Sequence, residues 1–577
     1  VVKLRPQDPE AHSNLGAALW ESGRLSQAEP VLRKALSQKP DMSEAYNNLG
    51  NVLRDLGQPA EAEKIYQQAL NNLWRYAEAY QGLGNALLDQ GRLSEAENAY
   101  NAALAIRPEY QEATFALENI LAKQEKFIES YSANQHVVCQ HYNKKDAVIT
   151  QNNIGNLLKD LGQFNAAEKA YRQALSTLPN YERVHSNLLL ATHYNPSQTA
   201  TEIFQEYENW RVKQTFDIVQ FTKYKIVEEE DNRLIVGILG GRFHRHPGLR
   251  LYLPALESLD NDKIKLVVYN YGKVKDDFTE RLESVAYEWQ DIHDLTDLEA
   301  AEKIQNDGIN VLINRAGHSE GRLRICAYKP APVQVQWGGF NTSGLHTMDW
   351  FLGDSVETPQ AEENLYTESI YRMPDGYVVF EPPDTAPDVG PLPARSTDKI
   401  TFGCFNNLAK INSKIVSIWS QILRNIPRSQ FFIKWAGLDY PGSKHRIEKL
   451  FAEEGISTDR LILEGDAPHK ALLASYNRVD IALDPWPYSG GLTTCESLWM
   501  GVPVITLPGP TFTGKHAASH LTNVGLADWI AKDGNDYVSK AIQWTQDLNS
   551  LEALRFSLRD QVAASPLCDG PRYAKNL

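Results

Sequence analysis

Residues 45–70 read AYNNLGNVLRDLGQPAEAEKIYQQAL, and related lines begin at residues 11, 79 and 150. The first three copies start 34 residues apart, and the fourth leaves room for one degenerate copy over residues 113–149. Small residues recur at fixed positions in the first three copies, namely Gly16, Gly50, Gly84, Ala28, Ala62 and Ala96. A period of this length is typical of helix–turn–helix units that stack into a superhelix, with small side chains where the helices touch. We therefore predict an α-solenoid over residues 1–183.

The repeat pattern resembles the tetratricopeptide repeat, which implies a concave face that binds an extended peptide. Asparagines share one repeat position, at Asn14, Asn48 and Asn153, and a second at Asn51, Asn85 and Asn156. Amide side chains can hydrogen-bond a peptide backbone whatever its sequence, so the first set is our candidate peptide-binding ladder. Plain solvated polar surface is the alternative reading of these asparagines. The repeats are also a candidate surface for self-association.

Beyond the repeats, short β-branched runs alternate with longer helical segments. In residues 184–380 the runs are RLIVGIL (233–239), IKLVVYN (264–270), INVLIN (309–314), VQVQW (333–337) and DWFLGD (349–354). In residues 399–577 they are ITFGCF (400–405), SQFFIKW (429–435), RLILEG (460–465), DIALD (480–484) and VPVITLP (502–508). This alternation predicts parallel sheets built from βαβ units. We predict a solenoid followed by two Rossmann-like halves, joined by a Pro- and Asp-rich linker at 381–398.

Composition narrows the function classes. The net charge of −15 argues against a nucleic-acid partner, because phosphate binding favours a basic surface. Five scattered cysteines without a C-x-x-C pair argue against disulfides or structural zinc, and they favour a reducing, cytoplasmic compartment. The sequence has no apolar run of ~18 residues, so no membrane span is expected. Neither half carries G-x-G-x-x-G, and the one D-x-D spacing, at 260–262, precedes a strand, so we expect no dinucleotide and no metal.

The stretch DPWPYSGGLTTCESLWMGVPVITLPG (484–509) could hold a ligand. Its strand leads through Gly490 and Gly491 into a helix expected to begin near residues 492–493. The free N–H groups and the positive dipole end of that helix would form an anion site at the cleft. Glu496, about one turn in, could accept the hydroxyl groups of a ribose. A capped core helix, with Glu496 merely favouring its dipole, is the alternative.

Two further loops follow strands and carry chemistry-bearing residues. In FGCFNNLAKIN (402–412), Asn407 lies at the carboxyl end of a strand, and Lys410 could meet phosphate charge at the neighbouring helix start. In GGRFHRHPGLR (240–250), His246 is a candidate general base, because histidine titrates near neutral pH. A surface lysine and a structural loop histidine are the corresponding alternatives.

The chain resembles the protein O-glycosyltransferases that include O-GlcNAc transferase and SPINDLY. The resemblance rests on the repeats together with four motifs: RLIVGILGGRFHRHP, PAPVQVQWGGFNTSG, FGCFNNLAKI and YSGGLTTCESLWMGVPVITLPG. The resemblance implies a GT-B fold and an inverting, metal-independent transfer of one sugar to Ser or Thr hydroxyls, without a cofactor. It implies that Lys410, beside Asn407, holds the diphosphate and that His246 contacts the reaction centre. The backbone amides of the helix start and the ribose-binding acid map to Leu492, Thr493, Thr494 and Glu496.

Two departures from the family pattern leave the donor open. Arg242 stands where relatives usually have an acid, and Gly491 stands where O-GlcNAc transferase has His. We take UDP-GlcNAc as the first choice of donor and GDP-fucose, as in SPINDLY, as the alternative. Protein acceptors are expected along the repeat groove. A catalytically decayed repeat scaffold that only binds proteins is the rival from another functional class.

Overall fold

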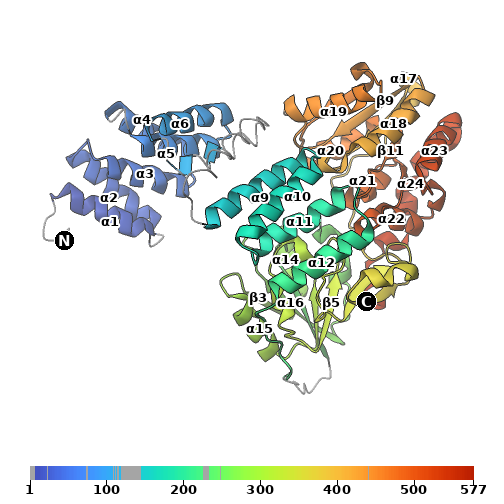
Figure 1. The fold of residues 1–577 in the computed structure, drawn as a ribbon, viewed down its shortest axis with the longest axis horizontal. Helices are drawn as coiled ribbons and strands as arrows, with labels where there is room; N and C mark the ends of the chain where they lie inside the picture. The colour runs from blue at the N-terminus through green and yellow to red at the C-terminus, as the bar shows by residue number, and fades with distance from the viewer. Residues whose placement is uncertain are drawn as a thin grey trace. The chain divides into compact units, whose positions relative to one another are not determined.

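The computed structural model describes residues 7–21, 24–72, 76–107, 144–224, 233–246, 248–439 and 441–577, together with residues 110, 112, 113, 116 and 117 (Figure 1). The chain forms two compact units, Val1–Asn143 and Lys144–Leu577, and each is described by itself. The degenerate repeat predicted at 113–149 lies largely outside the described residues. None of the described helices is both long enough and apolar enough to cross a lipid bilayer.

The first unit consists of paired antiparallel helices, as the repeat predicts. They are α1 (Pro9–Glu21), α2 (Leu25–Gln38), α3 (Ser43–Asp55), α4 (Pro59–Asn72), α5 (Ala77–Asp89) and α6 (Leu93–Ile106). A Cβ on Gly50 would lie 2.3 Å from Cζ of Tyr66, and one on Gly84 would lie 2.6 Å from Cε1 of Tyr100. The recurring glycines therefore make room for a large side chain of the partner helix.

The second unit begins with four more helices of the same kind: α9 (Lys144–Asp160), α10 (Phe164–Thr177), α11 (Glu182–Tyr194) and α12 (Ala200–Gln214). The α9–α10 pair is the copy that begins at residue 150. Gly155 repeats the packing seen above, because a Cβ there would lie 2.4 Å from Cε1 of Tyr171.

Two parallel sheets follow. The first has the strand order β3-β2-β1-β4-β5-β6-β7, with strands β1 (Leu234–Gly240), β2 (Ile264–Asn270), β3 (Glu288–Asp291), β4 (Val311–Asn314), β5 (Val333–Trp337), β6 (Trp350–Asp354) and β7 (Ser369–Met373). The second has the order β10-β9-β8-β11-β12, with β8 (Ile400–Cys404), β9 (Ser429–Lys434), β10 (Leu461–Glu464), β11 (Ile481–Leu483) and β12 (Val504–Ile505). The predicted solenoid with two α/β halves is confirmed.

Helices lie between these strands and after them. In the first half they are α13 (Leu253–Glu257), α14 (Asp277–Val285), α15 (Asp297–Asn306) and α16 (Arg324–Ala327). Those of the second half are α18 (Ser413–Asn425), α19 (Pro441–Glu453), α20 (His469–Ser475), α21 (Leu492–Trp499), α22 (His516–Val524), α23 (Gly534–Gln546) and α24 (Leu548–Ala563). The last helix, α25 (Gly570–Asn576), returns to the first half, where the Tyr573 hydroxyl donates to the Tyr377 carbonyl at 2.6 Å.

The predicted linker holds a short helix, α17 (Ala394–Thr397), and lies against the second half. The N–H of Gly390 donates to Oδ1 of Asn477 at 2.8 Å, and Arg555 Nε donates to the Gly390 carbonyl at 2.8 Å. The linker therefore has hydrogen-bonded partners on the half that follows it.

Candidate active site

The loop from β11 to α21 is held by one buried carboxylate. Asp484 accepts hydrogen bonds from the Gly490 N–H and from Oγ1 of Thr506, each at 2.7 Å. Burial raises the pKa of Asp484, and these two hydrogen bonds oppose that shift. The contacts fix the Gly490–Gly491 backbone immediately before the helix.

Helix α21 begins at Leu492 with Gly491 as its N-cap, as the sequence predicts. The N–H of Thr494 donates to the Gly491 carbonyl at 3.0 Å. The amides of Leu492 and Thr493 precede that bond, so they have no intrahelical partner and form the positive end of the helix. Thr494 is buried, and its hydroxyl donates to the Gly490 carbonyl at 3.0 Å.

Lys410 reaches this helix start from the second sheet. Its Nζ donates to the Ser489 carbonyl at 2.7 Å and to Oδ1 of Asn406 at 3.2 Å, and it lies 4.3 Å from the Tyr488 ring centroid. Burial lowers the pKa of Lys410, and the Asp484 carboxylate opposes that shift. The structure thus brings a partly desolvated ammonium next to the predicted anion site.

Asn406, and not the predicted Asn407, connects these groups. Oδ1 of Asn406 accepts from Lys410 Nζ and also from the Thr493 hydroxyl, at 3.0 Å. Asn407 is the N-cap of a short 3₁₀ turn, and its Oδ1 accepts from the Ala409 N–H at 2.9 Å. The side-chain oxygen of Asn407 is therefore bonded within its own turn. A donor-binding role for this residue stays a prediction.

Glu496 is buried, and its Oε1 lies 2.7 Å from Nε2 of His469 at the start of α20. His469 lies 27 residues before Glu496, outside the motifs quoted above, so no local pattern in the sequence points to it. The imidazole orients the carboxylate. Glu496 lies about one helical turn after the free amides of Leu492 and Thr493. This placement suits a carboxylate that accepts sugar hydroxyls, and that role stays a prediction.

His246 lies beyond the carboxyl end of β1, between two donors. Its Nδ1 lies 3.1 Å from the Gly248 N–H, and its Nε2 lies 3.3 Å from Nη1 of Arg242. A neutral imidazole has one acceptor nitrogen, so only one of these contacts is a hydrogen bond. Burial, with Arg242 and Arg315 nearby, lowers the pKa of His246 to about 4. The ring is therefore neutral at ordinary pH, and Arg242 competes for the lone pair that a general base would use.

A cavity of about 590 Å³ lies at the carboxyl ends of β1, β2 and β4, bounded on its other side by α11. Its lining includes Arg242 and Tyr271 from the loops after β1 and β2, and Arg183 and Asn187 from α11. Asn187 lies 34 residues after Asn153, so it continues the predicted asparagine ladder. Its Nδ2 donates to Oδ1 of Asn152 at 2.8 Å. The 34-residue spacing from Asn153 is a signal that points to Asn187 in the sequence. That signal is weak because the repeat around Asn187 lacks the recurring glycines.

The two asparagine sets of the repeats differ in their surroundings. Asn14 is exposed, and Asn48 and Asn153 are half-buried. In the second set each amide oxygen accepts from a tyrosine hydroxyl 15 residues later: Tyr66 to Asn51 at 2.8 Å, Tyr100 to Asn85 at 2.6 Å and Tyr171 to Asn156 at 2.8 Å. The second set therefore stabilises the helix pairs, and the first set is the one that stays a candidate for peptide binding.

Known protein families match most of the chain. The family model of glycosyl transferase family 41 matches residues 172–384 and 392–577, and tetratricopeptide-repeat models match residues 1–43, 41–109 and 150–181. The chain belongs to glycosyl transferase family 41. Within the part of this family 41 glycosyltransferase that the structure describes, no three His, Cys, Asp or Glu side chains are grouped as metal ligands.

Relatives of this family 41 glycosyltransferase carry related names. The probable UDP-N-acetylglucosamine–peptide N-acetylglucosaminyltransferase SPINDLY of Oryza sativa subsp. japonica is 32% identical over 420 residues, which are 71% of this chain and 45% of the relative. The protein of the same name from Arabidopsis thaliana is 32% identical over 407 residues, 69% of this chain and 44% of the relative. The chain thus spans less than half the length of these relatives.

A solved structure covers nearly the whole chain. A mutant of Thermobaculum terrenum O-GlcNAc transferase aligns with a TM-score of 0.74 and 27% identity, covering 92% of this chain and 95% of that one. The predicted family and the repeat-plus-GT-B fold of this family 41 glycosyltransferase are confirmed.

Proposed function

We propose that this family 41 glycosyltransferase is a protein O-glycosyltransferase, which transfers one sugar from a nucleotide-sugar donor to Ser or Thr hydroxyls. The observation that carries the proposal is the placement of Lys410 against the open start of α21, through Asn406 and the Ser489 carbonyl. A lysine and free helix amides at one point suit a departing diphosphate. The names of the two SPINDLY relatives, probable peptide N-acetylglucosaminyltransferases, support the same reaction.

The transfer needs a positioned hydroxyl, a proton acceptor and a stabilised leaving group. Lys410 and the amides of Leu492 and Thr493 take up the charge on the diphosphate as the sugar leaves. Glu496 accepts hydroxyl groups of the nucleoside ribose. His246, neutral at ordinary pH, takes the acceptor proton once the hydroxyl displaces Arg242 from Nε2. The reaction inverts the anomeric centre in a single displacement and uses neither a metal nor a cofactor.

UDP-GlcNAc is the donor we propose, because the relatives named above are named for it. GDP-fucose is the alternative that the sequence motifs raised, and no finding favours it over UDP-GlcNAc. Glycine has no side chain, so Gly491 does not indicate which nucleobase the donor carries. Thermal unfolding with UDP or with GDP tests the choice, because a ligand that binds only the folded state raises the unfolding temperature. Stabilisation by GDP alone would reverse our choice of donor.

Protein acceptors are proposed to lie along the repeats and to enter the cavity beside Asn187 and Arg242. Asn153 and Asn187 occupy one repeat register and lead toward that cavity. Replacing both with Ala should raise KM for a protein acceptor and leave the nucleotide affinity unchanged. Replacing Asn156, which is bonded to Tyr171, is the matched control and should lower stability instead. An unchanged KM in the double variant would remove the ladder from the proposal.

The compartment and the oligomeric state complete the proposal. The described cysteines Cys326, Cys404, Cys495 and Cys568 are unpaired, which suits the reducing cytoplasm. Self-association through the repeats is tested by the mass of the full chain in solution.

The rival function, a decayed scaffold, would bind proteins but neither UDP nor GDP. Calorimetry with both nucleotides separates it from an enzyme.

A further inference from the structure

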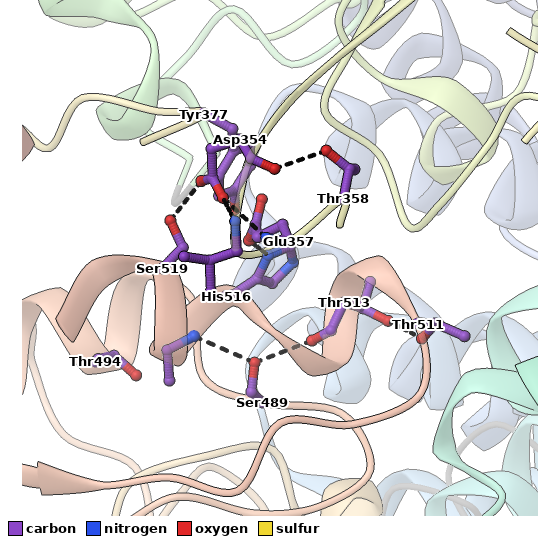
Figure 2. Close-up of polar contacts among 12 residues, drawn as sticks. Asp354, Glu357, Thr358, Tyr377, Ser489, Thr494, Thr511, Thr513, His516 and Ser519 are labelled. Carbon is purple, nitrogen blue, oxygen red and sulfur yellow. Dashed lines mark hydrogen bonds and ion pairs between the residues drawn. The ribbon is translucent and has the colours of Figure 1, made fainter. Parts of the chain in front are cut away.

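His516 and Glu357 form a buried pair that joins the two halves of the catalytic region. His516 is the first residue of α22, and Glu357 lies in the loop after β6. Nδ1 of His516 lies 2.6 Å from Oε1 of Glu357 (Figure 2). The two residues are 7% and 0% exposed. His516 lies in KHAASHLTNVGL (515–526), a stretch that takes part in the family resemblance, but nothing in the sequence gives either residue a role.

The surroundings allow this pair a single orientation. Asp354 accepts from the Glu357 N–H at 2.8 Å and from the Ser519 hydroxyl at 2.5 Å, which ties the Glu357 loop to α22 (Figure 2). The Tyr377 ring stacks on the imidazole at 5.2 Å between centroids, with 14° between the planes. The imidazole is therefore held from its edge and from its face.

The location of the protons follows from one unpartnered atom. Oε2 of Glu357 is buried and has no hydrogen-bond partner among the described residues. Burial raises the pKa of Glu357, and burial, with His520, Lys410 and His193 nearby, lowers the pKa of His516. Both shifts favour the neutral form of the group. A proton on Oε2 would have no acceptor, so the carboxyl proton lies on Oε1 and is donated to Nδ1. The other ring nitrogen, Nε2, then carries the imidazole N–H.

That N–H lies on the ring edge facing the start of α21. A Cβ placed on Gly491 would lie 3.8 Å from Cδ2 of His516, the carbon bonded to Nε2. Nε2 makes no hydrogen bond to any described residue and, unlike Oε2 of Glu357, it is not fully buried, so a ligand can reach it. Tyr488, whose ring lies under the Lys410 ammonium, is 6.4 Å from the imidazole between centroids. An accessible N–H without a protein partner is free to donate to an acceptor that arrives with a ligand.

We propose that His516 donates its Nε2–H to a phosphate oxygen of the donor's diphosphate, and that Glu357 is the positioning residue that holds the imidazole in this state. The proposal deepens the proposed function and rests on it. A phosphate oxygen is the acceptor we choose because the other groups at this point, Lys410 and the free amides of α21, also favour an anion. The pair adds a neutral donor to that set from a different helix.

Two substitutions of His516 test the roles of its two ring nitrogens separately. In His516→Asn the amide stands near the position of Nδ1, so it keeps the contact with Glu357 and loses the donor toward α21. In His516→Gln the amide N–H reaches the position of Nε2 and keeps that donor. Calorimetry with UDP, GDP and the corresponding nucleosides measures both variants of the full chain. Since hydrogen bonds to charged groups contribute about 1.5–3 kcal/mol, we expect His516→Asn to weaken nucleoside diphosphate binding roughly ten- to a hundredfold.

We expect His516→Gln to bind within about threefold of the unmodified protein, and we expect nucleoside affinity to stay unchanged in both variants. His520→Asn is the matched control, because His520 lies one turn later on α22 and also stacks on Tyr377. Unchanged diphosphate affinity in His516→Asn would overturn the proposal, and so would an equal loss for diphosphate and nucleoside. Failure of the unmodified protein to bind either diphosphate would instead overturn the proposed function itself.

Discussion

Replacing Lys410 with Met tests the leaving-group assignment most sharply, because Met keeps the length of the side chain and removes the charge. An ammonium about 4 Å from a phosphate charge, at an effective dielectric constant of about 20, contributes about 4 kcal/mol. Each 1.36 kcal/mol changes a rate tenfold, so we expect kcat/KM to fall about a thousandfold. Removing a single donor from an oxyanion site lowers kcat by about 10²–10³ in other enzymes, which is the same range.

The fold should survive this substitution. Lys410 loses two hydrogen bonds, to Ser489 and Asn406, but the protein no longer buries an ammonium. These contributions oppose each other, so we expect the free energy of unfolding to change by only about 1 kcal/mol. Initial rates of nucleoside diphosphate release, together with a thermal unfolding curve, measure both quantities. Lys414→Met is the control, because Lys414 is exposed four residues later and its Nζ donates to the Pro196 carbonyl.

The pH profile gives a second readout for Lys410. Burial lowers its pKa below the ordinary lysine value, and only the protonated form can stabilise the leaving group. Activity of the unmodified protein is therefore fully present below that lowered pKa and declines as the pH rises through it. The Met variant should lose this decline along with most of the rate. A kcat within threefold of the unmodified protein, or an unaltered pH profile, would refute the assignment.

Three further changes follow from the geometry. Arg242→Ala should raise the pKa of His246 from about 4 toward its ordinary value, so the acid limb of kcat/KM should move to higher pH; an unmoved limb would contradict His246 as the base. Glu496→Gln should weaken nucleotide binding about tenfold by calorimetry, and equal binding of the ribo- and deoxyribonucleotide by the unmodified protein would contradict a ribose contact. Gly50→Ala should destabilise the first unit by about 1–3 kcal/mol in denaturant unfolding, because its Cβ would overlap the Tyr66 ring; Tyr66→Leu should relieve part of that cost, and strict additivity would argue against the overlap.

The sequence predicted the strands that carry short apolar or β-branched runs. It missed β3 and β7, which are the two edges of the first sheet. The β3 residues read EWQD, and none of them is fully buried, so no apolar run or strict alternation indicates a strand. Edge strands face water on more sides than central ones, and their sequences carry a weaker signal.

The candidate site was predicted in part. The carboxyl ends of strands and the Gly-Gly step located Lys410 and the start of α21, because both depend on neighbouring residues in the chain. The choice of Asn406 over Asn407 depends on which side chain caps the turn and which faces the cleft, and a one-residue difference decides it. The pair of His516 and Glu357 joins residues 159 positions apart from different halves, so only the folded arrangement shows it.

The most direct test of the central claim is transfer itself. The full chain is incubated with a protein extract or a Ser/Thr-rich peptide and either UDP-GlcNAc or GDP-fucose, with Lys410→Met as the inactive control, and the acceptor is examined by mass spectrometry. We predict that the acceptor gains the mass of one N-acetylhexosamine per modified hydroxyl, from UDP-GlcNAc, with the unmodified protein only. Gain of a deoxyhexose from GDP-fucose would contradict the proposed donor. No mass gain from either donor, with no binding of UDP or GDP, would contradict the account as a whole.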